Sequence, residues 1–271
     1  MHLPPHPLRT RLLNTGRIEL WPAGLLRARG NTDARAIARA HTVLRRKRDG
    51  RYLAAVQEDG VLALVPRLAR EPGIDEALDA LAVAESHPGR GPVPPPRALP
   101  LERLRERLAT LGIDGDGYQA RTGLAPLAEP DWLVFAGRDR WLRPLWLQPR
   151  SARAWLAMRR AAAGDGVALE AISGYRSHDY QLGIVERKLA RGQSLEQILT
   201  VNAAPGYSEH HGGDALDIGT PGEPPAEESF EATAAFAWLG THAAAHGFSM
   251  SYPRANPHGI VYEPWHWRYT G

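Results

Sequence analysis

The chain has 271 residues, of which 43% are hydrophobic and 23% are charged, and its formal net charge is +3. These values are ordinary for a globular protein and leave room for one large domain or two small ones, each with a hydrophobic core. The absence of cysteine excludes disulfides, thiolate metal sites and a cysteine nucleophile, so any metal must be bound by His, Asp or Glu.

Residues 1–86 are predicted to form a small α+β domain of unknown role. Asp33 is expected to cap a helix, because the apolar residues that follow recur near helical spacing. Asp59-Gly60 lies between two apolar runs and is typical of a hairpin turn. Strands are predicted at residues 17–21, 52–57 and 61–66, and helices at residues 33–48 and 74–84.

Residues 87–100 are rich in proline and glycine, and we predict that they form a linker between two domains. Residues 101–271 then alternate helices with short strands, which favours an α+β domain. Ser194 and Gln197 fit a capping box, and Gly247 is expected to end a long alanine-rich helix. Helices are predicted at residues 101–111, 151–163, 178–190, 194–199 and 230–245, and strands at residues 167–172, 215–218, 248–252 and 260–269.

The segment 208–217 carries candidate metal ligands. A hydrolytic zinc ion takes three protein ligands and leaves one position open for water. His210 and Asp217 are seven residues apart, and this odd separation would place them on opposite faces of a straight strand. Gly212-Gly213 lies between them and can reverse the chain, so that the two side chains converge. The alternative is a polar loop with a capping residue.

The segment 263–268 adds a second histidine and a carboxylate. Glu263 and His266 are three residues apart, and Pro264 forbids regular strand pairing between them. A kink there could aim both side chains at one centre, with His266 on the metal and Glu263 free to accept a proton from the attacking water. Trp265 and Trp267 would form a wall of the site, although two tryptophans are also explained by core packing.

Arg176 lies in a third segment, residues 173–177, directly after a predicted strand and a Ser-Gly turn. A fixed cation at the end of a strand could stabilise the oxyanion of a tetrahedral intermediate. The alternative is a surface salt bridge, which is the usual situation of an arginine.

The three segments together resemble the M15 family of zinc peptidases, the D-alanyl-D-alanine carboxypeptidases and dipeptidases of VanY type. The family pattern is Ser-x-His-x-x-Gly-x-Ala-x-Asp, followed by Glu-x-Trp-His. The chain matches it at Ser208, His210, Gly213, Ala215, Asp217, Glu263, Trp265 and His266. The Ser-Gly-Tyr-Arg-Ser stretch with the following Tyr180-Gln181 is also typical, and the resemblance covers about residues 118–271.

The resemblance implies a fold and a set of roles. The fold is the compact α+β DD-peptidase fold shared with hedgehog-type domains, a small antiparallel sheet flanked by helices, here preceded by the α+β N-terminal domain. The implied roles are one zinc ion per chain on His210, Asp217 and His266, a catalytic base at Glu263, a carbonyl-polarising cation at Arg176, and contacts to the terminal D-amino acid from Gln181 and Ser208. Trp265, from the wall proposed above, is a further expected substrate contact.

The expected function is hydrolysis of the terminal D-alanine bond of peptidoglycan stem peptides. An L,D-carboxypeptidase, a dipeptidase, an L-Ala-D-Glu endopeptidase and a non-catalytic peptidoglycan-binding module stay open as alternatives. No nucleic-acid partner is indicated, and no apolar run reaches the roughly 18 residues of a membrane span. Residues 1–13 lack the apolar core of a signal peptide, which predicts the cytoplasm, whereas the substrate class predicts the cell envelope. The compartment and the oligomeric state therefore stay open.

Overall fold

The structure, a computed structural model, describes residues 10–28, 30–86 and 94–271. The chain divides into two compact units, Met1–Leu99 with Pro130–Phe135, and Pro100–Glu129 with Ala136–Gly271. The return of Pro130–Phe135 to the first unit was not expected from the sequence. We propose that the two units correspond to the two predicted domains. Residues 87–93 of the predicted linker lie outside the described residues.

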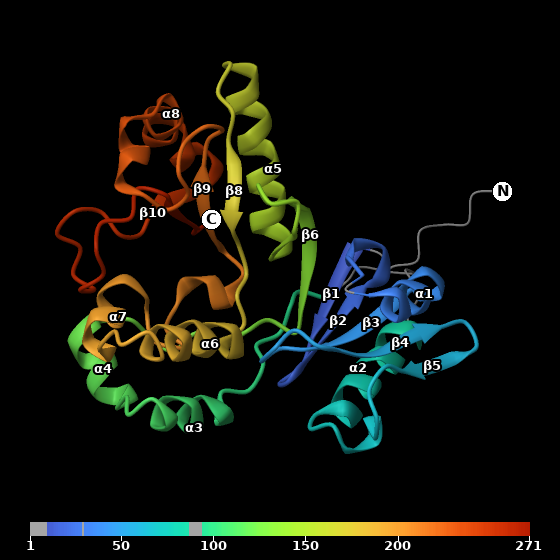
Figure 1. The fold of residues 1–271 in the computed structure, drawn as a ribbon. Coiled ribbons are helices and arrows are strands. Elements are labelled where there is room, and N and C mark those ends of the chain that lie inside the picture. Colours follow the sequence, from blue (N-terminus) through green and yellow to red (C-terminus); the bar gives the residue numbers. More distant parts are fainter. Residues whose placement is uncertain (1–9, 29, 87–93) are drawn as a thin grey trace. The chain divides into compact units, whose positions relative to one another are not determined.

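The first unit is built on an antiparallel sheet with the strand order β5-β4-β3-β2-β1-β6 (Figure 1). The strands are β1 (Arg11–Asn14), β2 (Ile18–Pro22), β3 (Thr42–Arg46), β4 (Tyr52–Gln57), β5 (Gly60–Ala63) and β6 (Trp132–Arg138), which continues into the second unit. The helices are α1 (Asn31–Arg39) and α2 (Ile74–Ser86), with 3₁₀ turns η2 (Ala23–Leu25) and η3 (Leu68–Arg70). Ile74, Ala77 and Leu81 of α2 join the same buried core as Leu20 and Leu53 of the sheet.

The predicted helix 33–48 is wrong. The helix α1 ends at Arg39, its N-cap is Gly30, and Asp33 lies in its first turn. The next residues form β3, which pairs with β2 and β4. Val43 and Leu44 are both fully buried and pack in different core clusters, one on each side of the sheet. Sheet pairing and burial on both faces therefore outweigh the helical spacing of the apolar residues.

The second unit contains a four-stranded antiparallel sheet in the order β10-β11-β9-β8, with helices around it (Figure 1). The four strands of this sheet are β8 (Glu170–Ser173), β9 (Ala215–Gly219), β10 (Phe248–Met250) and β11 (His266–Tyr269). A further strand, β7 (Pro144–Leu147), pairs with β6 instead. The helices are α3 (Glu102–Thr110), α4 (Gly115–Thr122), α5 (Pro149–Gly164), α6 (His178–Leu189), α7 (Leu195–Val201) and α8 (Ala234–His242). Shorter 3₁₀ turns are η4 (Glu209–Gly212), η5 (Glu228–Ala232) and η6 (Ala243–His246).

The α+β class and the small antiparallel sheet flanked by helices are therefore confirmed. The capping box at the start of α7 is also present, since the side chains of Ser194 and Gln197 each accept a hydrogen bond from the other residue's backbone N–H. Among the described residues, no helix combines the length and the apolar composition that a membrane span needs.

The predicted helix 230–245 and the predicted strand 260–269 differ most from the structure. The helix 230–245 is divided into η5, α8 and η6, because Thr233 is extended and its hydroxyl accepts a hydrogen bond from the N–H of Phe236, which starts a new helix there. Gly247 does end the last turn, with a φ of 78°. Of the predicted strand 260–269, only His266–Tyr269 forms a strand, β11, because the chain turns at residues 263–266 before it enters the sheet.

A buried ion pair joins α3 to α6, and we expect it to dominate the stability of this contact. Nε of Arg107 lies 2.7 Å from Oδ1 of Asp179, and both side chains are 8% exposed. Asp179→Asn should lower the free energy of unfolding by about 3 kcal/mol, because it leaves a buried guanidinium without its charged partner. Arg254→Ala removes an ion pair of which the arginine is 59% exposed, and should cost less than about 1 kcal/mol. Urea unfolding of both variants checks the difference, and equal losses would contradict it.

Candidate metal centre

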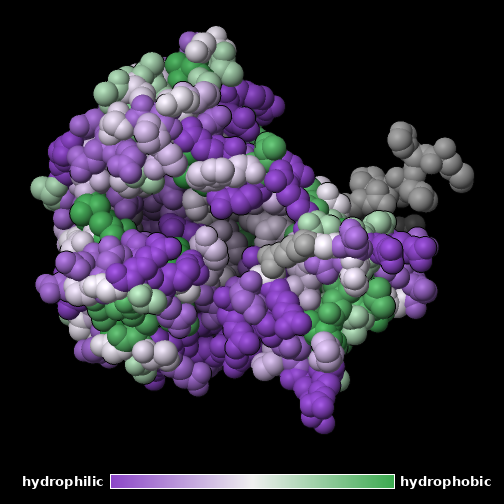
Figure 2. Space-filling model, viewed as in Figure 1, coloured by the Kyte–Doolittle hydropathy of each residue, from purple (hydrophilic) through white to green (hydrophobic). Residues whose placement is uncertain are grey.

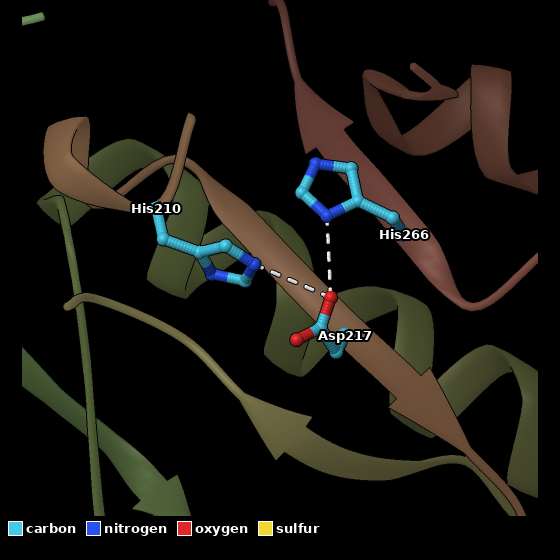
Figure 3. A group of neighbouring side chains, drawn as sticks. All are labelled: His210, Asp217 and His266. Atoms are coloured by element: carbon cyan, nitrogen blue, oxygen red, sulfur yellow. Dashed lines mark hydrogen bonds and ion pairs between the residues drawn. The ribbon is translucent and has the colours of Figure 1, made fainter. Parts of the chain in front are cut away.

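Three potential metal ligands converge from separate elements of the second unit (Figure 3). His210 lies in the 3₁₀ turn η4, and Gly213 ends this turn in the left-handed conformation with a φ of 75°. The chain then enters β9, which carries Asp217, and the adjacent strand β11 carries His266 directly opposite Asp217. The odd spacing of His210 and Asp217 is thus resolved by a helical turn that ends at the predicted reversal at Gly212-Gly213, directly before the strand.

The distances between these side chains fit a zinc ion. Nε2 of His210 and Nδ1 of His266 lie 3.3 and 3.2 Å from Oδ1 of Asp217. One ligand atom from each residue lies within 4.8 Å of both others, and all three residues are buried. Two zinc bonds of about 2.1 Å at a tetrahedral angle would place their ligand atoms about 3.4 Å apart. Nε2 of His210 is buried and makes no hydrogen bond, so a metal would supply its missing partner.

The second nitrogen of each ring is held by the protein. Nδ1 of His210 donates to the carbonyl oxygen of Gly174 at 2.7 Å, which leaves Nε2 of that ring unprotonated. Nε2 of His266 lies 2.9 Å from Oε2 of Glu209, whose other oxygen accepts a hydrogen bond from Arg268 at 3.0 Å. Such outer partners orient metal-binding imidazoles. Glu209 was not identified from the sequence, because its spacing from His266 gives no sign that the two meet.

The two histidines differ in their protonation. Burial lowers the pKa of His210 to about 4, and the nearby charge of Arg176 acts in the same direction. Burial also lowers the pKa of His266, but its hydrogen bonds to Asp217 and Glu209 outweigh this effect and raise the pKa to about 9. With these pKa values, His210 is neutral and His266 carries a proton at neutral pH.

Glu263 lies beside the three ligands and outside their cluster. The N–H of His266 donates to the carbonyl oxygen of Glu263, so residues 263–266 form a tight turn that includes Pro264. This turn brings Oε2 of Glu263 to 3.8 Å from Nδ1 of His266. Burial raises the pKa of Glu263 to about 7. A divalent cation on the neighbouring side chains would favour the carboxylate and lower this pKa.

Eight of the nine site residues predicted from the sequence line one cavity of about 270 Å³. Figure 2 shows a recess in the surface of this unit, between the region of β10 and the region of α6 and α7. Nη2 of Arg176 lies 3.9 Å from Oδ2 of Asp217, and its Nε is buried without a hydrogen bond. Gln181 donates from Nε2 to the carbonyl oxygen of Ala203 and leaves Oε1 without a hydrogen bond. The remaining lining residues from the prediction are Ser208, Trp265 and the cluster of His210, Asp217, Glu263 and His266.

Trp267 was expected on the wall of the site but lies elsewhere. It is buried, its Nε1 donates to the carbonyl oxygen of Pro264, and its ring packs against Phe236. Trp265 lies before the first residue of β11 and faces the cavity, whereas Trp267 follows His266 within the strand. Because successive side chains of a strand alternate, His266 and Trp267 point to opposite faces.

A buried polar network supports the loop that carries Arg176. Nδ1 of His211 donates to the carbonyl oxygen of Arg176 at 2.7 Å, and its Nε2 accepts from the N–H of Gly206 at 3.0 Å. Glu129 accepts hydrogen bonds from the hydroxyl of Tyr175 at 2.6 Å and from the N–H of His178 at 2.8 Å. His211 is thus a fully buried support of the loop. Glu129 was missed because 46 residues separate it from Tyr175 in the sequence.

Comparison with known proteins identifies similar chains. The family model described as VanY, D-alanyl-D-alanine carboxypeptidase, matches residues 144–271. YodJ, a carboxypeptidase candidate of Bacillus subtilis (strain 168), is 36% identical over 130 residues, which are 46% of this chain and 47% of YodJ. The chain therefore spans about half the length of this relative.

Two further relatives are matched over more of their length. The bifunctional D-Ala-D-Ala dipeptidase and carboxypeptidase VanXYC of Enterococcus gallinarum is 32% identical over 151 residues, 53% of this chain and 76% of that protein. A solved structure of the vancomycin-resistance D,D-pentapeptidase VanY from the VanB-type cassette, in complex with Zn(II), is 31% identical; the match covers 47% of this chain and 74% of that one, with a TM-score of 0.39.

Proposed function

The chain belongs to the VanY family of D-alanyl-D-alanine carboxypeptidases, and we propose that it is a zinc-dependent carboxypeptidase that hydrolyses the terminal D-alanine bond of peptidoglycan stem peptides. The observation that carries this proposal is the convergence of His210, Asp217 and His266 in one cavity with Glu263 and Arg176. Two imidazoles and one carboxylate form a donor set that zinc hydrolases use.

Each of the side chains in the cavity would have a separate role in the reaction. Zinc held by the three ligands would supply Lewis-acid chemistry and bring the pKa of a water molecule to about 7. Glu263 would accept the proton of the attacking water and pass it to the leaving amine, since its carboxylate lies within 3.8 Å of a ligand nitrogen without joining the cluster. Arg176 would stabilise the negative charge that develops on the scissile carbonyl oxygen.

Substrate binding would use the polar groups that the cavity leaves open. Gln181, with a free Oε1, and Ser208 would contact the terminal D-amino acid. Trp265 would cover the reacting bond and limit the access of water. The hydrogen bonds that the imidazoles donate to the carbonyl oxygen of Gly174 and the carboxylate of Glu209 would hold both rings in the orientation that the metal needs.

A non-catalytic module with structural zinc is the less favoured candidate. Structural zinc has four protein ligands as a rule, whereas the ligand cluster of the described residues has three members, with a carboxylate beside them.

Mass spectrometry of pentapeptide and tetrapeptide stems incubated with the protein separates the candidates. We expect loss of one D-alanine from the pentapeptide. Cleavage between L-Ala and D-Glu, loss of D-alanine from the tetrapeptide alone, or no cleavage would contradict the proposed bond.

Zinc binding should depend on pH through His266. In the metal-free protein its pKa of about 9 means that a proton occupies the imidazole at pH 7. Zinc needs the neutral ring, so binding should release about one proton from His266, and the affinity should rise about tenfold per pH unit between pH 7 and 9. Calorimetry in buffers of different ionisation enthalpy measures the released protons. Glu209→Gln should reduce their number, and a zinc affinity that is constant over this range would contradict the expectation.

A further inference from the structure

The cavity has a second cation on its wall, near the C-terminal end of α6. Of the described residues that line it, only Arg176 and Lys188 carry a guanidinium or an amino group. Arg176 lies beside Asp217, whereas Lys188 lies near the C-terminal end of α6. The proposed reaction gives Arg176 a role and leaves Lys188 without one.

The amino group of Lys188 has no ion-pair or hydrogen-bond partner among the described residues. Its side chain is half-buried, and this burial lowers its pKa. Val201 and Val261 also line the cavity, and neither can pair with a charge. A partly desolvated cation on the wall of a cavity is a binding position for an anionic group of a ligand.

The position of Lys188 on the helix sets the distance to that group. Gln181 and Lys188 are seven residues apart, which is close to two turns, so both side chains lie on the cavity face of α6. At 1.5 Å per residue this separation is about 10 Å along the helix axis. An extended peptide covers about the same distance in three residues.

We propose that Lys188 binds a second carboxylate of the substrate peptide, about three residues before the terminal D-amino acid. The inference rests on the proposed function, in which Gln181 contacts the terminal residue. The substrate class would then be an acidic peptide whose free carboxylate lies at the second position of a pentapeptide. Lys188 would select such peptides over the corresponding amides.

Two pentapeptides that differ in one group test this selection. They are L-Ala-γ-D-Glu-L-Lys-D-Ala-D-Ala and the same peptide with the free α-carboxylate of its D-glutamate converted to a carboxamide. The first quantity is kcat/KM for the acid divided by kcat/KM for the amide, measured from released D-alanine. The second is Kd of the amide divided by Kd of the acid, measured by calorimetry on a Glu263→Ala background. We expect wild-type protein to favour the acid about tenfold, as one charge-assisted hydrogen bond would do.

Variants at two neighbouring positions of α6 test whether Lys188 causes the preference for the acid. Lys188→Met should bring both ratios close to one, and Lys188→Arg should keep a preference for the acid. Arg187→Met removes an exposed cation that does not line the cavity and should leave the wild-type ratios unchanged. A wild-type ratio near one, or a ratio that survives in Lys188→Met, would overturn the proposal. If neither peptide is hydrolysed but the Kd ratio still depends on Lys188, the proposed activity fails and the carboxylate subsite stands.

Discussion

Glu263→Ala is expected to lower kcat by roughly a thousandfold while the protein keeps one zinc ion per chain. The size of the effect follows from the loss of a positioned general base, which contributes about 10² to 10⁴ in rate. Zinc should stay bound, because the ligand cluster consists of His210, Asp217 and His266 and does not include Glu263. The turn at residues 263–266 depends on a backbone hydrogen bond and on Pro264, so the loss of the side chain leaves the position of His266 intact.

Release of D-alanine gives the rate of this variant, and plasma emission spectrometry gives its zinc content. Glu106→Ala, at an exposed position of α3, is the matched control and should keep the wild-type rate. A Glu263→Ala variant within tenfold of wild type would rule out the assigned base. A variant that loses both activity and zinc would make Glu263 a ligand.

The second large effect is expected at the metal ligands. His210→Ala should remove zinc binding at micromolar concentration and lower kcat/KM at least about a thousandfold, because Lewis-acid stabilisation contributes several kcal/mol and each 1.4 kcal/mol is a factor of ten. Nε2 of His210 is a buried atom that makes no hydrogen bond, so the replacement removes the hydrogen bond from Nδ1 to Gly174, the approach to Asp217 and the ring contact with His266. A chelator should abolish the wild-type activity in the same way, and added zinc should restore it.

Thermal unfolding provides a readout of this variant that needs no catalysis. A ligand at one hundred times its Kd stabilises the folded state by about 2.7 kcal/mol, so zinc should raise the Tm of the wild-type protein. His210→Ala should show no such shift. His242→Ala, an exposed histidine stacked on Trp238, should keep the shift. An equal shift in His210→Ala would place the zinc elsewhere.

The sequence could predict the convergence of the candidate site because short segments determine it. Gly213 allows the left-handed turn between His210 and Asp217, and Pro264 lies in the turn that links Glu263 to His266. Both features are local and can be recognised from residue types. Whether the assembled residues have the proposed roles remains a prediction that the variants above test.

The parts that the sequence could not predict depend on contacts between distant segments. The strand β3 has helical spacing, and only its pairing with β2 and β4 makes it a strand. Glu209 meets His266 through the pairing of β9 with β11, and Glu129 reaches Tyr175 across the fold of the second unit. No spacing rule connects such residues, because the tertiary structure alone brings them together.

Anomalous diffraction from crystals of the zinc-loaded protein, recorded on both sides of the zinc absorption edge, tests the central claim most directly. The account predicts one zinc peak per chain, about 2.0 to 2.2 Å from Nε2 of His210, Nδ1 of His266 and a carboxylate oxygen of Asp217, with Glu263 outside bonding distance. A peak at other residues, or a fourth protein ligand that closes the open position, would contradict it.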